Sequence, residues 1–415
     1  MFLLSIAFDT ITFKEHRLRT EREPMPAMIF HTAYPLNRKA VGASGLRPVA
    51  MRDAFEAAGY TVFEITGYAA ERKQRIAQLR KKLAAGQHFE FLYSENATIP
   101  AMVTEPRHFP PHFLLDFSLF RLCRAHHIPT SVFYRDAYWR FPLYREHVKE
   151  PLRSIMKATY RYELRGYDAY ADVLFLPSRE MIPYLPPMRS ARCIPLPPGA
   201  SIIDDGSIIG DAATATSLVS TDTTTPAAHT ATPSAHKTLN IFYIGGLGGH
   251  YRLLNMVHAA ATIPDIHFTM CVPKDNWERC QDEYHEVLST PNITLIHASG
   301  PERDALYATA DICYVPMEPH SYGAFAAPLK LYEYIGRGKP IIAVDNTVTA
   351  NVVTHNGIGW TTENSAAALS ELIHYLLAHP DDVQEKREQC RRIRNEHTWE
   401  RRAQYVAEIL TQKSQ

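Results

Sequence analysis

The sequence of 415 residues contains no run of about 18 apolar residues, so no helix that spans a bilayer is predicted. Cysteine is scarce: there are six, none in a Cys-x-x-Cys pair and none grouped with histidine at the spacing of zinc ligands. We therefore expect free thiols in a reducing cytoplasm. The apolar start, MFLLSIAFDTITF, lacks the basic residues that open a secretory signal, so we expect a cytoplasmic protein whose residues 1–27 form an N-terminal extension.

Net charge is also lacking, because 44 Lys and Arg residues balance 44 Asp and Glu residues. The balance hides an asymmetry between the two halves of the chain. Residues 28–200 hold 24 basic and 15 acidic residues, a net of +9, whereas residues 238–415 hold 15 and 21, a net of −6. This asymmetry predicts that the first half faces something anionic.

The order of apolar runs and glycine loops predicts two α/β units in succession. The first begins with AMIFHTAYP, a strand, followed by a glycine loop, an amphipathic helix and a second strand, TVFEITG. Such a βαβ start implies a parallel sheet. The same order begins again at LNIFYIGGLGGHYRLLNMVHAA. We expect two doubly wound, Rossmann-like domains, one over residues 28–200 and one over 238–412, separated by a disordered, Thr/Ala/Ser-rich insertion at 206–237.

A glycine-containing loop follows the first strand of each predicted unit. In YIGGLGGHYRL these glycines are Gly245, Gly246, Gly248 and Gly249, and in GASGLRP the candidate is Gly45. Glycine lets backbone N–H groups approach phosphate oxygens, and the following helix N-terminus adds partial positive charge. A tight turn without a ligand would use the same residues. The spacing is neither that of an NAD-binding fingerprint nor that of a Walker loop.

The stretch PLKLYEYIGRGKPII, residues 328–342, resembles the nucleotide-sugar-binding segment of GT-B glycosyltransferases, in particular the large GT4 family (glycosyl transferases group 1). The family pattern is carried by Pro328, Lys330, Glu333, Gly338 and Pro340. The resemblance covers residues 238–412 well and extends loosely through the first half. It implies a GT-B fold, in which two Rossmann-like domains face a central cleft.

The resemblance also implies roles for two of these residues. The family's glutamate, here Glu333, accepts hydrogen bonds from the ribose hydroxyls of a nucleotide-diphosphate sugar, and Lys330 reaches the diphosphate. The alternative is an ordinary ion pair, because Lys and Glu at i, i+3 are neighbours on a helix. The donor is a substrate, so no cofactor is expected. Enzymes of this fold commonly need no metal, and no Asp-x-Asp motif stands in a convincing loop; Asp204 and Asp205 border the low-complexity segment.

Two positions depart from the family pattern. Phe325 stands where the family has a second glutamate, and Leu247 stands where it has an arginine for the diphosphate. His250 and Arg252 are the nearest cationic candidates, although Arg252 equally fits an exposed helix surface. These differences leave open whether the enzyme retains or inverts configuration at the transferred sugar.

The other domain should supply a group that acts on the sugar or the acceptor. In SVFYRDAYWRFP, Asp136 follows a predicted strand, within a cluster of aromatic and charged residues typical of carbohydrate sites. Asp136 would deprotonate the acceptor hydroxyl in an inverting enzyme and orient the sugar in a retaining one. An aspartate that merely caps the next segment is the simpler alternative.

The acceptor is less well defined by the sequence. Two basic stretches, residues 71–83 and a series of cations spaced by four, fit either a solvated surface or contact with anionic lipid. The series is Arg145, Lys149, Arg153, Lys157, Arg161 and Arg165. Lipid contact would suit a peripheral enzyme at the inner face of the membrane with a saccharide or lipid-linked acceptor. No nucleic-acid partner is expected.

Three functions are compatible with these features. The first is a hexosyltransferase with a nucleotide-diphosphate sugar as donor, acting in cell-surface polysaccharide or glycolipid synthesis. The second is a GT-B-fold epimerase that acts on a nucleotide sugar. The third is a nucleotide-sugar-binding protein without catalysis, which Phe325 and Leu247 would suit.

Overall fold

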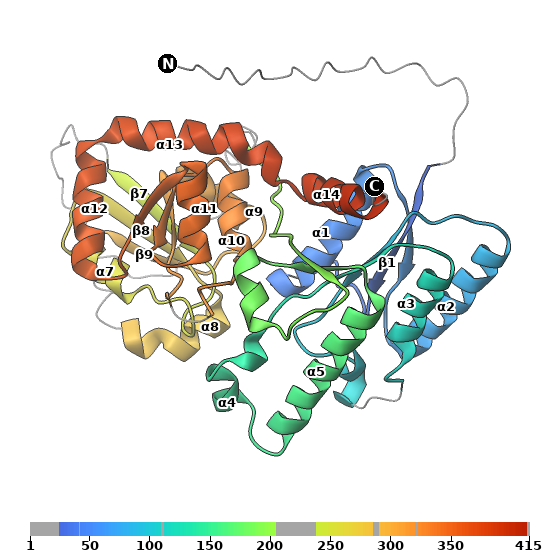
Figure 1. Ribbon diagram of the computed structural model, residues 1–415. Coiled ribbons are helices and arrows are strands. Elements are labelled where there is room, and N and C mark those ends of the chain that lie inside the picture. Colours follow the sequence, from blue (N-terminus) through green and yellow to red (C-terminus); the bar gives the residue numbers. More distant parts are fainter. Residues whose placement is uncertain are drawn as a thin grey trace, which may run out of the picture.

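The computed structural model of the chain describes residues 25–40, 42–108, 112–204, 238–284, 290–319 and 322–412. Two α/β domains lie side by side (Figure 1), and each is built on a six-stranded sheet. All of the strand pairs in both sheets are parallel. The predicted fold class is therefore confirmed. The predicted insertion at 206–237 and all but the last three residues of the predicted extension at 1–27 lie outside the described residues.

The N-terminal sheet has the strand order β2-β1-β3-β4-β5-β6. Its inner strands are buried along their whole length, as in β1 and β5, and consist of apolar runs that can be covered on both faces. The strands are β1 (Ala27–Thr32), β2 (Thr61–Ile65), β3 (Leu92–Glu95), β4 (Thr130–Phe133), β5 (Val173–Leu176) and β6 (Arg192–Pro195).

The C-terminal sheet has the strand order β12-β11-β10-β7-β8-β9. Its strands are β7 (Leu239–Ile244), β8 (Ile266–Cys271), β9 (Ile293–Ile296), β10 (Ile312–Val315), β11 (Ile341–Val344) and β12 (Gly359–Thr362). In each sheet the strand order reverses at one point, between β1 and β3 and between β7 and β10. Ligands of open α/β sheets bind beyond the strand ends at such points.

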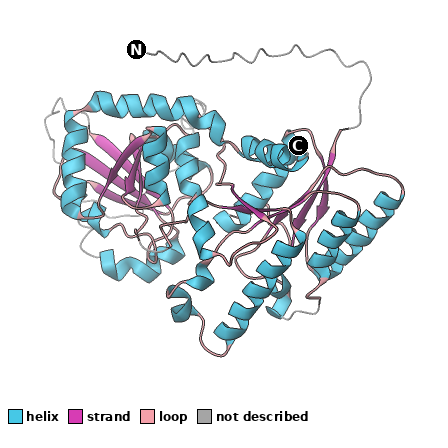
Figure 2. Cartoon of the chain, in the orientation of Figure 1, coloured by secondary structure: helices cyan, strands magenta, loops and turns pink. Residues whose placement is uncertain are grey.

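Helices cover both faces of each sheet (Figure 2). In the N-terminal domain they are α1 (Ala43–Ala57), α2 (Ala69–Ala84), α3 (Leu115–Ala125), α4 (Leu143–His147) and α5 (Leu152–Tyr170). The later helices are α7 (Leu254–Ala261), α8 (Lys274–Cys280), α9 (Pro301–Thr309), α10 (Leu329–Gly336), α11 (Val348–Asn356), α12 (Ala366–Ala378), α13 (Pro380–Ile393) and α14 (Trp399–Thr411). Helices α2, α3 and α5 pack on one face of the first sheet, and α1 packs on the other.

The last helix, α14, does not belong to the domain in which the sequence places it. Its buried residues, among them Trp399, Val406 and Leu410, share one core cluster with β1 and α1 of the N-terminal domain. The chain therefore passes between the domains a second time. This return is invisible in the sequence because α14 has an ordinary apolar stripe, which fits the face of either sheet equally well.

Candidate active site between the two domains

Two adjoining cavities lie between the domains, and Leu329 lines both. We call the first the Asp136 cavity. Its walls are Ser44, Arg47, Thr98, Phe133, Arg135, Asp136, Pro177 and Pro198 from the N-terminal side, and Tyr251, Tyr322 and residues 325–329 from the C-terminal side. We call the second the Glu333 cavity. It is lined by Arg38, Lys39, Ala40, Leu46, Ala50, Gly199, Ser201, Ile203, Ser299, Gly300, Arg303, Leu329, Glu333, Arg337 and Trp399.

Asp136 lies directly beyond β4 and is held from both domains. One carboxylate oxygen accepts a hydrogen bond from the backbone N–H of Tyr138 at 2.7 Å, and the other accepts from the hydroxyl of Tyr322 at 3.0 Å. The first contact is the cap expected of a simple strand-end aspartate. The second joins Asp136 to the opposite wall of the cleft. Burial raises the pKa of Asp136 to about 6, although these hydrogen bonds oppose the shift. The group can thus exchange a proton near neutral pH.

Lys330 lies in the first turn of α10 and points toward the glycine loop. Its Nζ donates to the hydroxyl of Tyr243 at 2.9 Å and lies 3.6 Å from the ring centroid of Tyr251. Desolvation lowers the pKa of Lys330 to about 7, and Glu333 opposes the shift. The simple Lys330–Glu333 ion pair is not formed, since Lys330 is directed to the tyrosines instead. The ammonium is therefore held beside the loop with aromatic rings as its partners.

Glu333 faces the other cavity. It lies one turn after Lys330 on α10, and its Oε2 accepts a hydrogen bond from the hydroxyl of Tyr307 at 3.5 Å. Arg303 and Arg337 line the same cavity, and both approach the single carboxylate of Asp304. One short helix thus places a carboxylate in the wall of the Glu333 cavity and an ammonium beside Tyr251, which belongs to the wall of the Asp136 cavity.

The glycine loop after β7 is shaped by its positive backbone angles. Gly245 has φ +136°, and a Cβ there would lie 2.5 Å from Nζ of Lys330, so any other residue would displace the lysine. Asn276 holds the loop: its Oδ1 accepts from the N–H of Leu247, and a Cβ on Gly246 would lie 3.4 Å from the same oxygen. Gly245 therefore lets Lys330 approach the backbone closely, whereas a Cβ on Gly246 would meet Asn276 at an ordinary contact distance.

Two predicted site residues lie elsewhere than expected. Arg252 is exposed, and neither the Asp136 cavity nor the Glu333 cavity includes it. Gly45 does not lie in a loop, because α1 already begins at Ala43. A Cβ on Gly45 would come within 2.3 Å of Cβ of Ala40, so close packing explains the glycine. Gly45 borders a further cavity, formed by the N-terminal domain alone.

The aromatic cluster around Asp136 belongs mostly to the core rather than to a sugar-binding surface. Tyr134 and Trp139 are buried, and Trp139 stacks on Tyr160 with ring centroids 5.2 Å apart. Phe325, at the position of the family's second glutamate, is also buried and stacks on Phe141 at 5.4 Å. Phe325 therefore anchors its loop in the N-terminal core and contributes an apolar ring, not a carboxylate, to the wall of the Asp136 cavity.

Arg135 belongs to the predicted charged cluster around Asp136, but nothing in the sequence indicated that Arg47 lines the cleft beside it. Arg47 and Arg135 both pair with Glu95, at 3.0 and 3.4 Å, although these residues are far apart in the chain. Glu95 ends β3, and a carboxylate at a strand end was the one available signal for this group. Its two partners come from α1 and from the segment after β4, which only the tertiary fold brings together.

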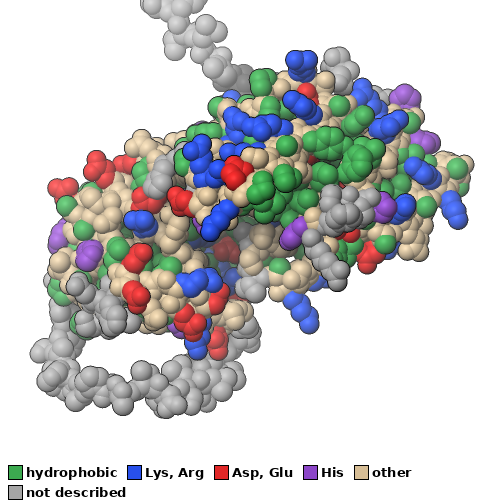
Figure 3. All heavy atoms as spheres, turned by 90° about the horizontal axis from the view of Figure 1, so that it is seen from below, with side chains coloured by type: hydrophobic (Ala, Val, Ile, Leu, Met, Phe, Trp, Pro, Cys, Tyr) green, Lys and Arg blue, Asp and Glu red, His purple; other side chains and the backbone are tan. Residues whose placement is uncertain are grey.

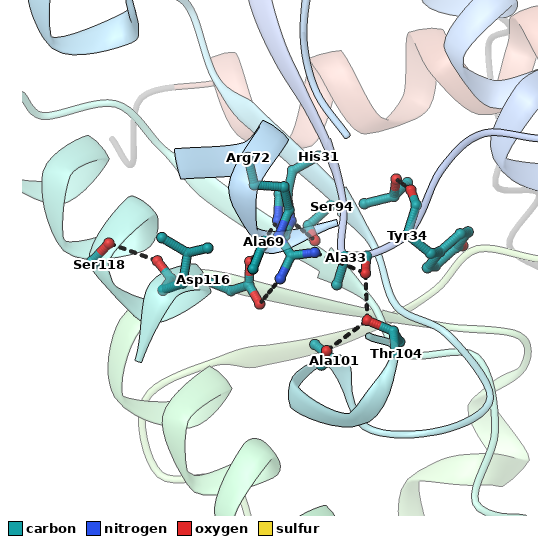
Figure 4. Close-up of polar contacts among 12 residues, drawn as sticks. His31, Ala33, Tyr34, Ala69, Arg72, Ser94, Ala101, Thr104, Asp116 and Ser118 are labelled. Carbon is teal, nitrogen blue, oxygen red and sulfur yellow. Dashed lines mark hydrogen bonds and ion pairs between the residues drawn. The ribbon is translucent and has the colours of Figure 1, made fainter. Parts of the chain in front are cut away.

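A second polar network lies deeper in the N-terminal domain (Figure 4). His31 Nδ1 lies 2.8 Å from the hydroxyl of Ser94, and His31 Nε2 lies 3.1 Å from Asp116. This order resembles a serine hydrolase triad, but all three side chains are buried and none lines either cleft cavity. Arg72, which joins Asp116 and donates to the carbonyl of Ala33 at 2.9 Å, ties the network to the loop after β1. The network therefore supports the wall of the cleft.

Comparisons with known proteins agree with this geometry. Residues 225–397 match the model of the family described as glycosyl transferases group 1. None of the curated proteins matches the sequence. Sucrose-phosphate synthase from Thermosynechococcus elongatus has a similar structure, with 15% identity, a TM-score of 0.58, and coverage of 94% of this chain and 99% of that chain.

Two further solved structures are similar over nearly the whole chain. HepE of Anabaena, in complex with UDP and glucose, has 11% identity and a TM-score of 0.57, with 94% of this chain and 100% of that chain covered. WaaG, a glycosyltransferase involved in lipopolysaccharide biosynthesis, has 12% identity and a TM-score of 0.52, with the same coverage of both chains. The chain therefore has the GT-B fold, and its residues 225–397 match the model of glycosyl transferases group 1.

Proposed function

We propose that the protein transfers a hexose from a nucleotide-diphosphate sugar to a saccharide or lipid-linked saccharide. The observation that carries this proposal is the placement of Lys330 and Glu333 on one helix beside two adjoining cavities. Glu333 lines one cavity, and Lys330 lies 3.6 Å from the ring centroid of Tyr251, which lines the other together with Asp136. The similar structure of Anabaena HepE, which holds UDP and glucose, supports a donor of this class.

In this proposal the donor spans both cavities. Glu333 accepts hydrogen bonds from the ribose hydroxyls in the Glu333 cavity. The diphosphate lies beside Lys330, the glycine loop and the N-terminus of α10, where a cation and a helix dipole both stabilise negative charge. The hexose then extends toward Asp136. Lys330 and the helix N-terminus neutralise the departing diphosphate, and no resident metal or cofactor takes part.

The reaction joins an acceptor oxygen to the anomeric carbon and breaks the bond from that carbon to the diphosphate oxygen. The transition state has oxocarbenium character, so charge on the diphosphate grows as the sugar leaves. In an inverting transfer, Asp136 takes the proton of the acceptor hydroxyl. In a retaining transfer, that proton goes to the departing phosphate oxygen and Asp136 orients the sugar. The anomeric configuration of the product distinguishes the two.

Donor binding should weaken as pH rises through about 7, where Lys330 loses its proton. The pKa of Lys330 is lowered from its ordinary value to about 7, so the ammonium is present below this pH and lost above it. Since a bound diphosphate favours the charged form, the affinity for UDP-glucose or GDP-mannose should fall about tenfold between pH 6 and pH 8. Titration calorimetry at several pH values measures this. Lys330→Met should remove the pH step, and the exposed Lys73→Met is the matched control.

Turnover should depend on ionised Asp136 and rise through about pH 6. Asp136→Asn should lower kcat about 100-fold or more while donor affinity and melting temperature stay unchanged.

Tyr322→Phe removes a hydrogen bond that lowers the pKa of Asp136, so the rise of kcat with pH should shift to higher pH. Release of nucleoside diphosphate, with simple glycosides, lipid-linked saccharides or water as acceptor, is the readout. Full activity of Asp136→Asn would contradict this role, and donor epimerisation without an acceptor would favour the epimerase.

We also propose that the N-terminal domain binds anionic membranes through α4, α5 and their junction. Leu152 and Ile155 are 56% and 59% exposed there, next to the basic series that begins at Arg145. Burial, followed by the nearby charges of Arg145, Arg153 and Arg161, lowers the pKa of Lys157, which shows that these cations lie close together. Figure 3 shows hydrophobic and basic side chains side by side on this face. No helix within the described ranges is long and apolar enough to cross a membrane.

This surface predicts salt-sensitive binding to anionic vesicles. Replacing Arg153, Lys157 and Arg161 by glutamine should weaken sedimentation with phosphatidylserine vesicles about 100-fold, because each cation contributes ~1 kcal/mol near such a surface. The matched control replaces Arg75, Lys81 and Lys82, which lie on the other basic helix, α2. Equal binding to neutral and anionic vesicles, or equal effects of the two triple variants, would contradict the proposal. The basic face of α5 would then be an ordinary solvent-exposed surface.

A further inference from the structure

A third cavity adjoins the Asp136 cavity and is formed by the N-terminal domain alone. We call it the Tyr34 cavity, and its lining residues are Tyr34, Pro35, Leu36, Asn37, Ala40, Gly42, Ser44, Gly45, Ala97, Thr98, Ile99 and Arg135. It shares Ser44, Thr98 and Arg135 with the Asp136 cavity, so the two spaces adjoin. A molecule bound at these shared residues would lie next to the Asp136 cavity on its N-terminal side.

The lining of the Tyr34 cavity carries positive charge that nothing in the cavity balances. It includes the guanidinium of Arg135 and no Asp or Glu side chain. The carboxylate that pairs with Arg135 is Glu95, and Glu95 also pairs with Arg47 at 3.0 Å. Two guanidinium groups thus share one buried carboxylate. Asp136 is not a second carboxylate partner for these arginines, because its oxygens accept hydrogen bonds from Tyr138 and Tyr322.

Both arginines also have N–H groups without a partner. Nη1 of Arg47 and Nε of Arg135 are buried and form no hydrogen bond with any residue in the described part of the chain. Arg47 is only 5% exposed and lies 3.4 Å from the ring centroid of Phe133. An unpaired N–H of a buried cation costs more than that of a neutral group, so an anionic ligand that accepts from it would be stabilised strongly.

The first turn of α1 adds to the same region. Gly42, Ser44 and Gly45 line the Tyr34 cavity, and α1 has no side-chain cap and no acidic residue in its first turn. The N–H groups of Gly45 and Leu46 already donate to the carbonyl of Gly42 at 3.0 Å, so a ligand here can accept only from N–H groups earlier in this 15-residue helix. The helix start and the two arginines converge where the two cavities join.

We propose that the acceptor is anionic, with a phosphate or carboxylate group held by Arg135, Arg47 and the start of α1 while its attacking hydroxyl lies at Asp136. This proposal rests on the proposed transferase function and names the class of its acceptor. The donor is the less suitable source of the anion. Its diphosphate is proposed to bind Lys330 and the glycine loop of the C-terminal domain, whereas the Tyr34 cavity is lined by N-terminal residues only.

Calorimetric titration with small probes tests this assignment. The probes are inorganic phosphate, glucose 6-phosphate, glucuronate and glucose. We expect glucose 6-phosphate or glucuronate to bind at least tenfold more tightly than glucose, and inorganic phosphate to compete with whichever of them binds. Arg135→Gln should weaken these anions about tenfold or more, and Arg135→Lys should restore part of the affinity. Arg121→Gln, an exposed change on α3, is the matched control.

Arg135 is preferable to Arg47 as the site of substitution, because Arg47 remains to pair with Glu95 and the fold should be kept. Where Arg47 is tested, Arg47→Gln leaves Arg135 to pair with Glu95, so the buried carboxylate keeps a partner. A melting temperature close to that of the unchanged protein confirms folding. With the fold kept, Arg47→Gln should also weaken the anions.

A parallel titration with UDP-glucose and GDP-mannose separates the possible failures. Unchanged nucleotide-sugar affinity in Arg135→Gln, together with lost anion affinity, supports an anionic acceptor. An equal loss of both would assign the arginines to the donor and overturn the inference. Anion binding that is absent or insensitive to Arg135, beside normal nucleotide-sugar binding, overturns the inference alone. Anion binding at Arg135 without any nucleotide-sugar binding overturns the proposed transferase function instead, and with it the assignment of the anion to an acceptor.

Discussion

The chain passes between the two domains twice, and hydrogen bonds between these two connecting segments fix the relative position of the domains. The cleft depends on this contact. The backbone N–H of Ala200 donates to the carbonyl of His397 at 2.7 Å, and that of Trp399 donates to the carbonyl of Ala200 at 3.3 Å. Gly199 allows this approach, since a Cβ there would lie 2.7 Å from Trp399. The crossings and α14 thus keep the carboxyl ends of the two sheets facing each other.

The charge of each domain does not predict the charge of its side of the cleft. The C-terminal half is acidic overall, yet Lys330 lies beside Tyr251 in the wall of one cavity, and Arg303 and Arg337 line the other. On the opposite side, Arg47 and Arg135 share Glu95. On each side of the cleft, two guanidinium groups thus share one carboxylate, Asp304 or Glu95, an arrangement that suits substrates carrying negative charge at more than one place.

The sequence predicts those parts of the site that local patterns encode. Lys330 and Glu333 lie on one helix, and the glycine loop follows a buried strand, so the local pattern and its resemblance to the family segment identify them. The Arg47–Glu95–Arg135 group is joined only by tertiary packing, and Gly45 needs the position of Ala40 to be understood. Strands β6 and β12 were not predicted from the sequence. Each is a short, partly exposed strand at a sheet edge and lacks a strong apolar run.

The most direct test of a nucleotide-sugar site in this cleft is calorimetry with UDP-glucose and GDP-mannose on the unchanged protein and on Glu333→Gln. Loss of hydrogen bonds to an ionised carboxylate costs ~1.5–3 kcal/mol, so we expect at least one of these donors to bind and Glu333→Gln to weaken it tenfold or more. The exposed Glu371→Gln on α12 should leave the affinity unchanged. Equal affinity of the unchanged protein and a folded Glu333→Gln variant would contradict the assignment of the Glu333 cavity to the donor ribose.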